Sequence, residues 1–318
     1  MTSTSETSRN ARSIHATPAS AALHRLRANR SVVAGGALLL AVILVASAIP
    51  PLAHLDPYAV DPAQRLAGPD GEHLLGTDTF GRDLLARVAA GAKSSLIVGG
   101  AVAALSGLLG TAFGILASSF RVLDQILMRV CDGLMAIPAL LLAVALAAAL
   151  GPSVPNLIAA LTVVATPSVA RLVRSRALAV MSETFVEASR AQGAGSWHII
   201  VRHVLPNVLS VLAVQVTFIF ADAIITEAAL SFLGAGVPTP QPSWGNILYD
   251  GKGVILQAPM MTVAASAALV VTVLALNLLG DGLRDVVDPR ASRAGASPGM
   301  LTRLIGSRRR GAPAQDAI

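Results

Sequence analysis

Long apolar stretches without charged residues restrict the fold of this chain more than any other feature. Four of them are entirely uncharged and lie at Ser31–Ala53, Ser94–Phe120, Gly133–Ala170 and Gly253–Gly280. A fifth, Asn207–Leu233, is interrupted only by two acidic residues. About 20 consecutive apolar residues suffice for a helix to cross a bilayer. The sequence therefore predicts an all-α, polytopic membrane protein.

The third stretch must contain two helices, because its 38 residues exceed what one span needs. Two prolines and a glycine within Gly151–Asn156 favour a turn in its middle. Pro138 is expected to bend the helix that precedes this turn. These divisions give six transmembrane helices in total.

Composition excludes the ordinary soluble classes of protein. Of 318 residues, 54% are apolar and 13% are charged, whereas soluble domains carry roughly a quarter of charged residues. The formal net charge of +6 does not indicate nucleic acid binding, because the arginines flank the apolar stretches instead of forming one basic surface. The single cysteine, Cys131, excludes an internal disulfide. The histidines are not spaced as metal ligands, so no metal site is expected.

Both ends of the chain are polar. Residues 1–24 are expected to form a disordered cytoplasmic tail, and residues 285–318 a second cytoplasmic tail. Residues 25–92 would hold the first transmembrane helix and an external amphipathic segment, and residues 93–284 the remaining five helices. The Ala-x-Ala pattern at Ala46–Ala48 would also fit a cleaved signal peptide, but the apolar stretch continues past it, which favours a retained helix.

The segment between the first two spans, residues 54–93, is polar enough to leave the membrane. Asp78 or Thr79 could cap an amphipathic helix there. Its apolar side would hold Phe80, Leu84, Leu85 and Val88, and its polar side Arg82, Asp83 and Arg87. Ion pairs of Asp78 and Asp83 with the two arginines are favoured over a metal or catalytic role for these carboxylates.

Small residues recur at spacings of three and four along the second span. They are Ala103, Gly107, Gly110 and Gly114. Such a stripe permits close contact with a neighbouring helix in a membrane.

A polar segment from Thr184 to Pro206 separates the fourth and fifth spans. It is expected to form two short amphipathic helices joined by glycines, the second of which begins near Ser196. Ser182 would cap the first helix, and Gly193 would end it in a left-handed conformation. Pro206 would end the second helix and begin the next span.

This segment, residues 182–206, resembles the EAA loop of ABC importer membrane subunits. The residues that carry the resemblance are Glu187, Ala188, Ser189, Gly193, His203, Leu205 and Pro206. Ser189 replaces an alanine of the family pattern, and His203 stands where many members have isoleucine. The resemblance implies a cytoplasmic coupling helix that docks on a partner ATPase.

Two further motifs, at His73–Leu96 and Thr226–Gly245, resemble the peptide and nickel branch of the same family. The segments at Asp124–Ala143 and Leu276–Arg290 also resemble the family, the latter its terminal motif. Over roughly residues 25–290, the chain is similar to the second of the two permease subunits of dipeptide, oligopeptide or nickel importers. The implied fold is that of a type I ABC importer permease with a MetI-like core.

The resemblance also implies a set of partners in the bacterial inner membrane. These are a homologous second permease subunit, cytoplasmic ABC ATPase subunits, an extracytoplasmic substrate-binding protein and the lipid bilayer, with no nucleic acid. The sequence has no P-loop pattern, so energy must come from a partner or from an ion gradient. The resemblance implies that ATP and Mg bind to the partner ATPases and that this chain carries no cofactor and no catalytic residue. Peptides are the expected cargo, with nickel, glutathione and haem as alternatives.

The fifth span carries polar residues that could line a solute pathway. Gln215, Asp222 and Thr226 share one side of a helix at spacings of seven and four, and Glu227 follows them. An acidic group facing lipid costs roughly 3 kcal/mol, so these groups should face other helices, a cavity or the membrane interface. A gradient-driven secondary transporter, which is the alternative class, would use Asp222 and Glu227 as proton or ion sites.

Positive charges predict the orientation in the membrane. With both termini in the cytoplasm, the inner segments hold 19 of the 24 lysines and arginines, and the outer segments hold the other 5. This bias places the EAA-like loop and both termini on the cytoplasmic side. Trp244, in an external turn, would then anchor the chain at the outer membrane interface.

Overall fold

The computed structural model describes residues 26–52 and 56–287. In these residues every regular element is a helix, which confirms the all-α prediction. The helices are α2 (Arg30–Leu52), α3 (Leu84–Ser119), α4 (Arg121–Met135), α5 (Ala139–Leu150), α6 (Val154–Met181), α7 (Thr184–Ala191), α8 (Ser196–Ile199), α9 (Leu205–Phe232), α10 (Trp244–Gly251) and α11 (Pro259–Val287). A 3-10 turn, η1 (Pro62–Gln64), precedes α3, and a π-helical segment (Ile200–Val204) joins α8 to α9.

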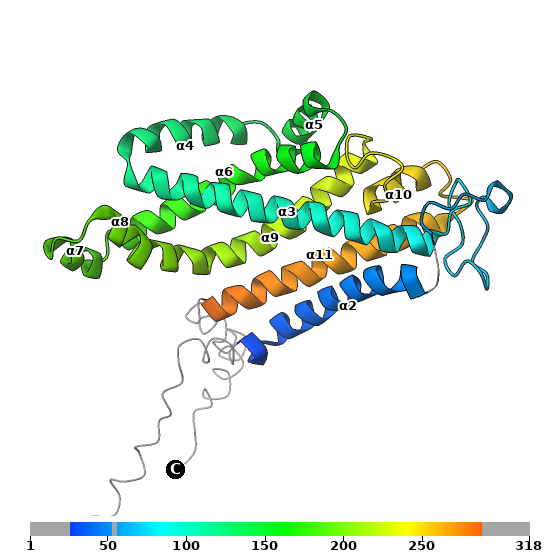
Figure 1. Cartoon of the computed structure of the whole chain (residues 1–318), viewed down its shortest axis with the longest axis horizontal. Helices are drawn as coiled ribbons and strands as arrows, with labels where there is room; N and C mark the ends of the chain where they lie inside the picture. The colour runs from blue at the N-terminus through cyan, green and yellow to red at the C-terminus, as the bar shows by residue number, and fades with distance from the viewer. Residues whose placement is uncertain (1–25, 53–55, 288–318) are drawn as a thin grey trace, which may run out of the picture.

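The long helices lie side by side, α4 and α5 lie along one side of them, and the other short elements lie at the two ends of the bundle (Figure 1). One end holds α7 and α8, together with the start of α2 and the end of α11. The opposite end holds α10 and residues 56–83. Because the predicted coupling segment and the two predicted inner termini share one end, we call it the coupling end, and we call the opposite end the outer end.

Each predicted span has a helical counterpart in the described residues, but the third is broken. Among the described residues, five helical segments are long and apolar enough to cross a membrane, and the pair α4 and α5 would make a sixth if it counts as one broken span. The two helices meet at an angle of 96°. Pro138 lies at this break, directly before α5, where a proline cannot continue the preceding helix. The bend predicted at Pro138 is therefore confirmed, and it is sharp enough to divide the helix.

Close packing of α3 on α6 and α9 forms the centre of the bundle. A Cβ atom added to Gly114 would lie 2.6 Å from the Cβ atom of Val173 on α6. One added to Gly107 would lie 2.9 Å from a methyl group of Val216 on α9. Contacts this short require glycine, so the predicted small-residue stripe on α3 does serve as a helix-packing surface.

The fifth span begins earlier than predicted. Helical backbone runs without a break from Ser196 to Phe232, so Pro206 lies inside a continuous helix and does not separate two. The π-helical segment Ile200–Val204 lies just before Pro206, and at its end the N–H of Leu205 donates to the carbonyl of Ile200. A proline ring clashes with the preceding turn of a regular α-helix, and the wider π-helical turn lies where that clash would occur.

The predicted amphipathic helix before the second span does not exist as a separate element. Helix α3 begins at Leu84 and continues through the whole span to Ser119. Its cap is Asp83, whose carboxylate accepts a hydrogen bond of 2.7 Å from the N–H of Ala86. The prediction of Asp78 or Thr79 as the cap was therefore wrong. Asp83 also bonds the ring of His73, at 2.9 Å, and does not pair with an arginine.

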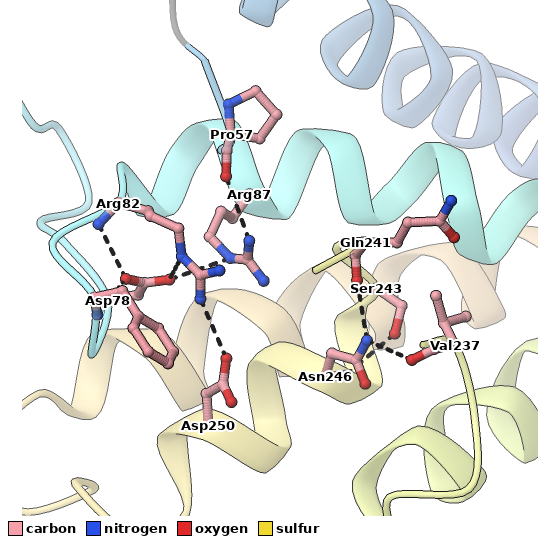
Figure 2. A network of polar contacts seen from close by, with 10 residues as sticks. Pro57, Asp78, Arg82, Arg87, Val237, Gln241, Ser243, Asn246 and Asp250 are labelled. Carbon is pink, nitrogen blue, oxygen red and sulfur yellow. Dashed lines mark hydrogen bonds and ion pairs between the residues drawn. The ribbon is translucent and has the colours of Figure 1, made fainter. Parts of the chain in front are cut away.

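Asp78, Arg82 and Arg87 form a buried ion-pair cluster with Asp250 and do not face water (Figure 2). One carboxylate oxygen of Asp78 lies 2.6 Å from Nε of Arg82 and 3.2 Å from Nε of Arg87. Arg82 also reaches Asp250 on α10, at 3.5 Å. The predicted pairing of Asp78 with both arginines is confirmed, but the predicted exposure of this side is wrong, since Asp78 and Arg87 are only 1% and 2% exposed. Burial raises the pKa of Asp250, and Arg87 and Arg82 oppose that shift.

Trp244 also lies inside the molecule instead of at a membrane interface. Its side chain is fully buried, and its Nε1–H donates to the carbonyl of Val88 on α3, at 3.1 Å. The neighbouring Asn246 ties the preceding turn to α10, because its amide donates to the carbonyls of Val237 and Gln241 (Figure 2). The outer end is thus one packed unit built from α3, α10 and the loops around them.

Candidate functional site

The predicted coupling segment forms a short exposed helix with a defined stop. Helix α7 ends in a Schellman motif, in which the N–H of Ala194 bonds the carbonyl of Ser189 and the N–H of Gly193 bonds that of Arg190. Gly193 has φ of +87°, as the sequence predicted. A side chain there would have open space but a strained backbone, so the requirement for glycine is conformational.

The start of this helix differs from the prediction. Glu183 occupies the N-cap position of α7, without a side-chain capping bond, and Ser182 is the C-cap of α6. The hydroxyl of Ser182 donates back to the carbonyl of Ala179. Ser182 therefore belongs to the end of the fourth span, and its role as the cap of α7 was wrongly predicted.

Three apolar side chains fix the coupling segment to the end of α6. Val186, Ile199 and Val204 are buried in one cluster with residues of α6, including Val173 and Val180. The cluster also takes in Ile219 of α9. The coupling segment thus packs against both α6, which precedes α7, and α9, which follows it.

The seven residues of the EAA-like pattern itself are exposed or half-buried. Glu187, Ala188, Gly193 and Pro206 are exposed, and Ser189, His203 and Leu205 are half-buried. The ring of His203 packs between Phe185 and His198, with ring centroids 5.5 and 6.1 Å apart. Trp197, which sequence reasoning did not single out, is 76% exposed beside them. Large aromatic residues are enriched at protein interfaces. A tryptophan within this polar segment was therefore the signal that the sequence offered.

The predicted pathway residues divide into two groups. Asp222 and Thr226 line a cavity of about 340 Å³. Its walls come from α3, α6, α9 and the break between α4 and α5, with residues such as Pro138 and Leu161. Gln215 lies nearer the start of α9, is half-buried, and is not among the residues that line this cavity. Among the described residues that line it, Asp222 alone is charged.

Glu227 lies away from this cavity and is fully buried. Its two carboxylate oxygens each accept a hydrogen bond of 2.7 Å, one from Ser95 on α3 and one from Ser231 on α9. The Ser231 hydroxyl in turn accepts from the N–H of Val237. Glu227 thus joins two helices and the outer turn in the described chain.

A second polar group, which the sequence analysis did not identify, lies between α4 and α6. Arg171 pairs with Asp132, and Arg174 pairs with Asp124. Together with Arg129 these residues line a groove of about 550 Å³. The pairs join positions about 40 to 50 residues apart in the chain, so no local pattern indicates them. Across the described residues, no three His, Cys, Asp or Glu side chains are grouped as metal ligands.

Comparison with known proteins agrees with this architecture. Residues 109–293 match the family described as binding-protein-dependent transport system inner membrane component. Residues 17–69 match the N-terminal TM domain of oligopeptide transport permease C.

Several curated relatives match most of the chain. A permease protein of Brucella abortus, named for a peptide transport system, is 47% identical over 271 residues, which are 85% of this chain and 92% of the relative. The dipeptide transport system permease of Alkalihalophilus pseudofirmus is 38% identical, with coverage of 85% and 89%. The glutathione transport system permease of Pectobacterium atrosepticum is 40% identical, with coverage of 70% and 74%.

The fold resembles that of a solved transporter. Chains from two inward-facing crystal forms of the MetNI methionine ABC transporter superpose with TM-scores of 0.52 and 0.54, at 23% and 24% identity. They cover 62% and 64% of this chain, and 94% and 96% of their own length. The matched residues, the relatives and the helical architecture together show that this chain belongs to the family of binding-protein-dependent transport inner membrane components, as the permease component of an ABC importer.

Proposed function

We propose that this chain forms half of the translocation pathway of an ATP-driven importer for short peptides. The observation that supports peptide cargo best is the 47% identity, across 85% of the chain, to a relative named for peptide transport. The other half would come from a homologous permease subunit, and an extracytoplasmic binding protein would deliver the peptide. ATP and Mg would bind to partner ATPase subunits, and no covalent chemistry would occur on this chain.

The coupling end is suited to receive the motion of an ATPase. Helix α7 exposes Glu187, the residue we propose to contact a basic or backbone donor group of that partner. Burial of Val186, Ile199 and Val204 against α6 links α7 rigidly to the spans. Closure of the ATPases would therefore move α6 and α9 together and switch the pathway between its outward-facing and inward-facing states.

Asp222 and Thr226 are the proposed pathway residues of this chain. They lie in a cavity whose other lining residues are mostly apolar. Inside a membrane such a carboxylate favours a cationic group nearby, and the protonated amino terminus of a peptide would supply one. Glu227, which the sequence analysis grouped with them, is assigned a structural role by its bonds to Ser95 and Ser231.

The coupling end is proposed to lie in the cytoplasm. The excess of lysine and arginine in the segments assigned to the inner side supports this orientation. Both described termini, at the start of α2 and the end of α11, lie at the same end as α7 (Figure 1).

Co-purification tests the assembly and the coupling role. We expect the tagged chain to bring a second permease and an ATPase from membranes, and Glu187→Lys to reduce the bound ATPase without reducing the amount of permease. Asp281→Lys makes the same change of charge at an exposed position of α11, outside the coupling segment, and should leave the ATPase bound. A chain that purifies alone and moves solute in sealed vesicles without ATP would contradict the proposal and favour a gradient-driven transporter.

Competition for uptake tests the cargo. We expect excess unlabelled dipeptide to suppress ATP-dependent uptake of a labelled dipeptide by proteoliposomes that hold the complete transporter. The relative named for glutathione transport makes glutathione the second candidate. Absence of dipeptide uptake, together with ATP-dependent uptake of labelled glutathione, nickel or haem by the same proteoliposomes, would overturn the peptide assignment while leaving the permease role intact.

A further inference from the structure

An apolar groove on the side of the bundle has features of a lipid-binding site. It lies between α2 and α3, has a volume of about 640 Å³, and is lined at its inner part by Leu39, Ile43, Leu96, Ile97 and Phe220. Small residues, Ala46 and Ala90, flank its other part, together with Ser47 and Lys93. The apolar part would hold an acyl chain, and Ser47 and Lys93 make the opposite part polar.

The polar part of the groove lies toward the outer end of the bundle. Lys93 directly precedes the uncharged stretch of the second span, which begins at Ser94. It therefore lies where a lysine can extend its ammonium group to the headgroup level while its methylenes stay against apolar surface. Ser47 lies on the half of α2 nearer the same end. The polarity of the groove, polar outward and apolar inward, matches that of a phospholipid in the outer leaflet.

The charge of the groove selects among phospholipids. Lys93 is exposed, is the only charged residue in the lining, and forms no ion pair with any described residue. Helix α2, which forms the opposite wall, contains no acidic residue over Arg30–Leu52. A cation without a protein carboxylate nearby favours an anionic headgroup over a zwitterionic one.

The floor of the groove is fixed by close packing, so its shape does not depend on a ligand. A Cβ atom added to Gly99 would lie 2.9 Å from the ring of Phe220 and 2.6 Å from Ile224. The phenyl ring therefore packs directly on the α3 backbone and forms a firm base beneath Ile97. Phe220 also packs against a buried apolar cluster that contains Ile224, Trp244 and Leu276.

We propose that this groove binds an anionic phospholipid of the outer leaflet, with an acyl chain along Ile43, Leu96 and Phe220 and the phosphate group at Lys93. The proposal depends on the chain lying in a membrane with its coupling end in the cytoplasm, as proposed above, but not on the identity of its cargo. It would make the position of α2 against α3 sensitive to the lipid composition of the membrane.

Native mass spectrometry of the complete transporter, with phosphatidylglycerol and phosphatidylcholine as probes, tests this proposal. We expect phosphatidylglycerol to remain bound preferentially, and Lys93→Gln to weaken its binding about fivefold, the change expected for one lysine at an anionic lipid surface. Lys93→Arg keeps the charge and should retain the lipid. Lys252→Gln removes the other outer lysine, which packs on Tyr249 away from the groove, and should have no effect.

A second variant tests the acyl-chain part without changing charge. Ala90→Trp fills the groove and should displace both phospholipids, while Val263→Trp, at an exposed apolar position of α11 outside the groove, should displace neither. Equal binding of the two phospholipids, or full retention of phosphatidylglycerol by Lys93→Gln, would overturn the proposal. So would a disulfide crosslink between a cysteine placed at Ile97 and the partner permease, because the groove would then be a subunit interface.

Discussion

The two ends of the bundle use charged residues in opposite ways. At the outer end, Asp78, Arg82 and Arg87 are buried and bind one another and α10. At the coupling end, Glu187 and Arg190 of α7 face outward, and only Val186 of that helix is buried. The charges of this buried outer cluster are thus satisfied within the chain, whereas those of α7 remain available to a partner.

This difference indicates how motion divides between the ends. The outer cluster joins the loop before α3 and the start of α3 to α10, which lies far from them in the sequence, so it holds the three as one body (Figure 2). The coupling segment is held to α6 and α9 by one apolar cluster, and its first helix, α7, ends in an exposed turn at Gly193. Substitutions at the outer end should therefore reduce the stability of the fold, and those in α7 should reduce coupling.

The largest expected effect comes from breaking the outer cluster. Asp78→Ala leaves Arg82 and Arg87 buried beside a single remaining carboxylate, Asp250. Removing one partner of a buried ion pair costs about 3–5 kcal/mol of unfolding free energy. Chemical unfolding of the purified chain in detergent measures this loss. Glu72→Ala, an exposed position in the same loop, is the control, and an equal loss in both variants would contradict the assigned role of the cluster.

The two acidic residues of α9 offer a second test. Glu227 is buried and hydrogen-bonded, whereas Asp222, five positions earlier, lines a cavity. Glu227→Ala leaves the hydroxyls of Ser95 and Ser231 without their acceptor and should cost about 2–3 kcal/mol. Asp222→Ala should change stability by no more than about 0.5 kcal/mol, but reduce uptake of peptides with a free amino terminus. The reverse pattern, with Asp222 required for folding and Glu227 only for transport, would refute the separation of their roles.

Gly193 is the position where the coupling end should be most sensitive. Gly193→Ala forces a side chain into a left-handed conformation, which costs about 1–2 kcal/mol. Since the strain is local, hydrogen exchange of the α7 amides should quicken about tenfold while the unfolding midpoint of the spans stays unchanged. Gly195→Ala is a matched control, because Gly195 has φ of −69° and equally open surroundings. Similar exchange in both variants would show that the stop at Gly193 is not what orders α7.

Much of the fold could be predicted because it depends on local properties of the sequence. The length of an apolar stretch sets a span, and the first span predicted at Ser31–Ala53 is found at Arg30–Leu52. The small residues of α3 and the turn at Gly193 were likewise predictable, since each follows from a side chain's own size or conformational freedom. The exposure of α7 was predictable because it lies in a polar segment between two spans.

The features that sequence missed depend on distant partners. A polar helix side has the same pattern whether it faces water or a carboxylate such as Asp250, so the burial of Arg82 and Arg87 could not be read locally. Trp244 fits an interface anchor by position, yet the carbonyl of Val88 supplies its partner in the core. Within the candidate site the same limit applies to Glu227, which the sequence groups with Asp222 only as an acidic residue of the fifth span, whereas its partner Ser95 lies 132 positions away on α3.

The smallest expected effect lies at His203 of the EAA-like pattern. The ring is half-buried and makes aromatic contacts with Phe185 and His198, so its role here is packing. His203→Ile fills the same space with apolar surface, which offsets the lost aromatic pairs, each worth about 0.5–1.5 kcal/mol. We expect unfolding free energy and ATP-driven uptake to stay within about 0.5 kcal/mol and twofold of the parent chain. His203→Ala, which leaves the space empty, should cost more than His203→Ile. If the isoleucine variant alone abolished uptake, the histidine would be a contact of the ATPase, and the coupling end would use a specific ring as well as an exposed charge.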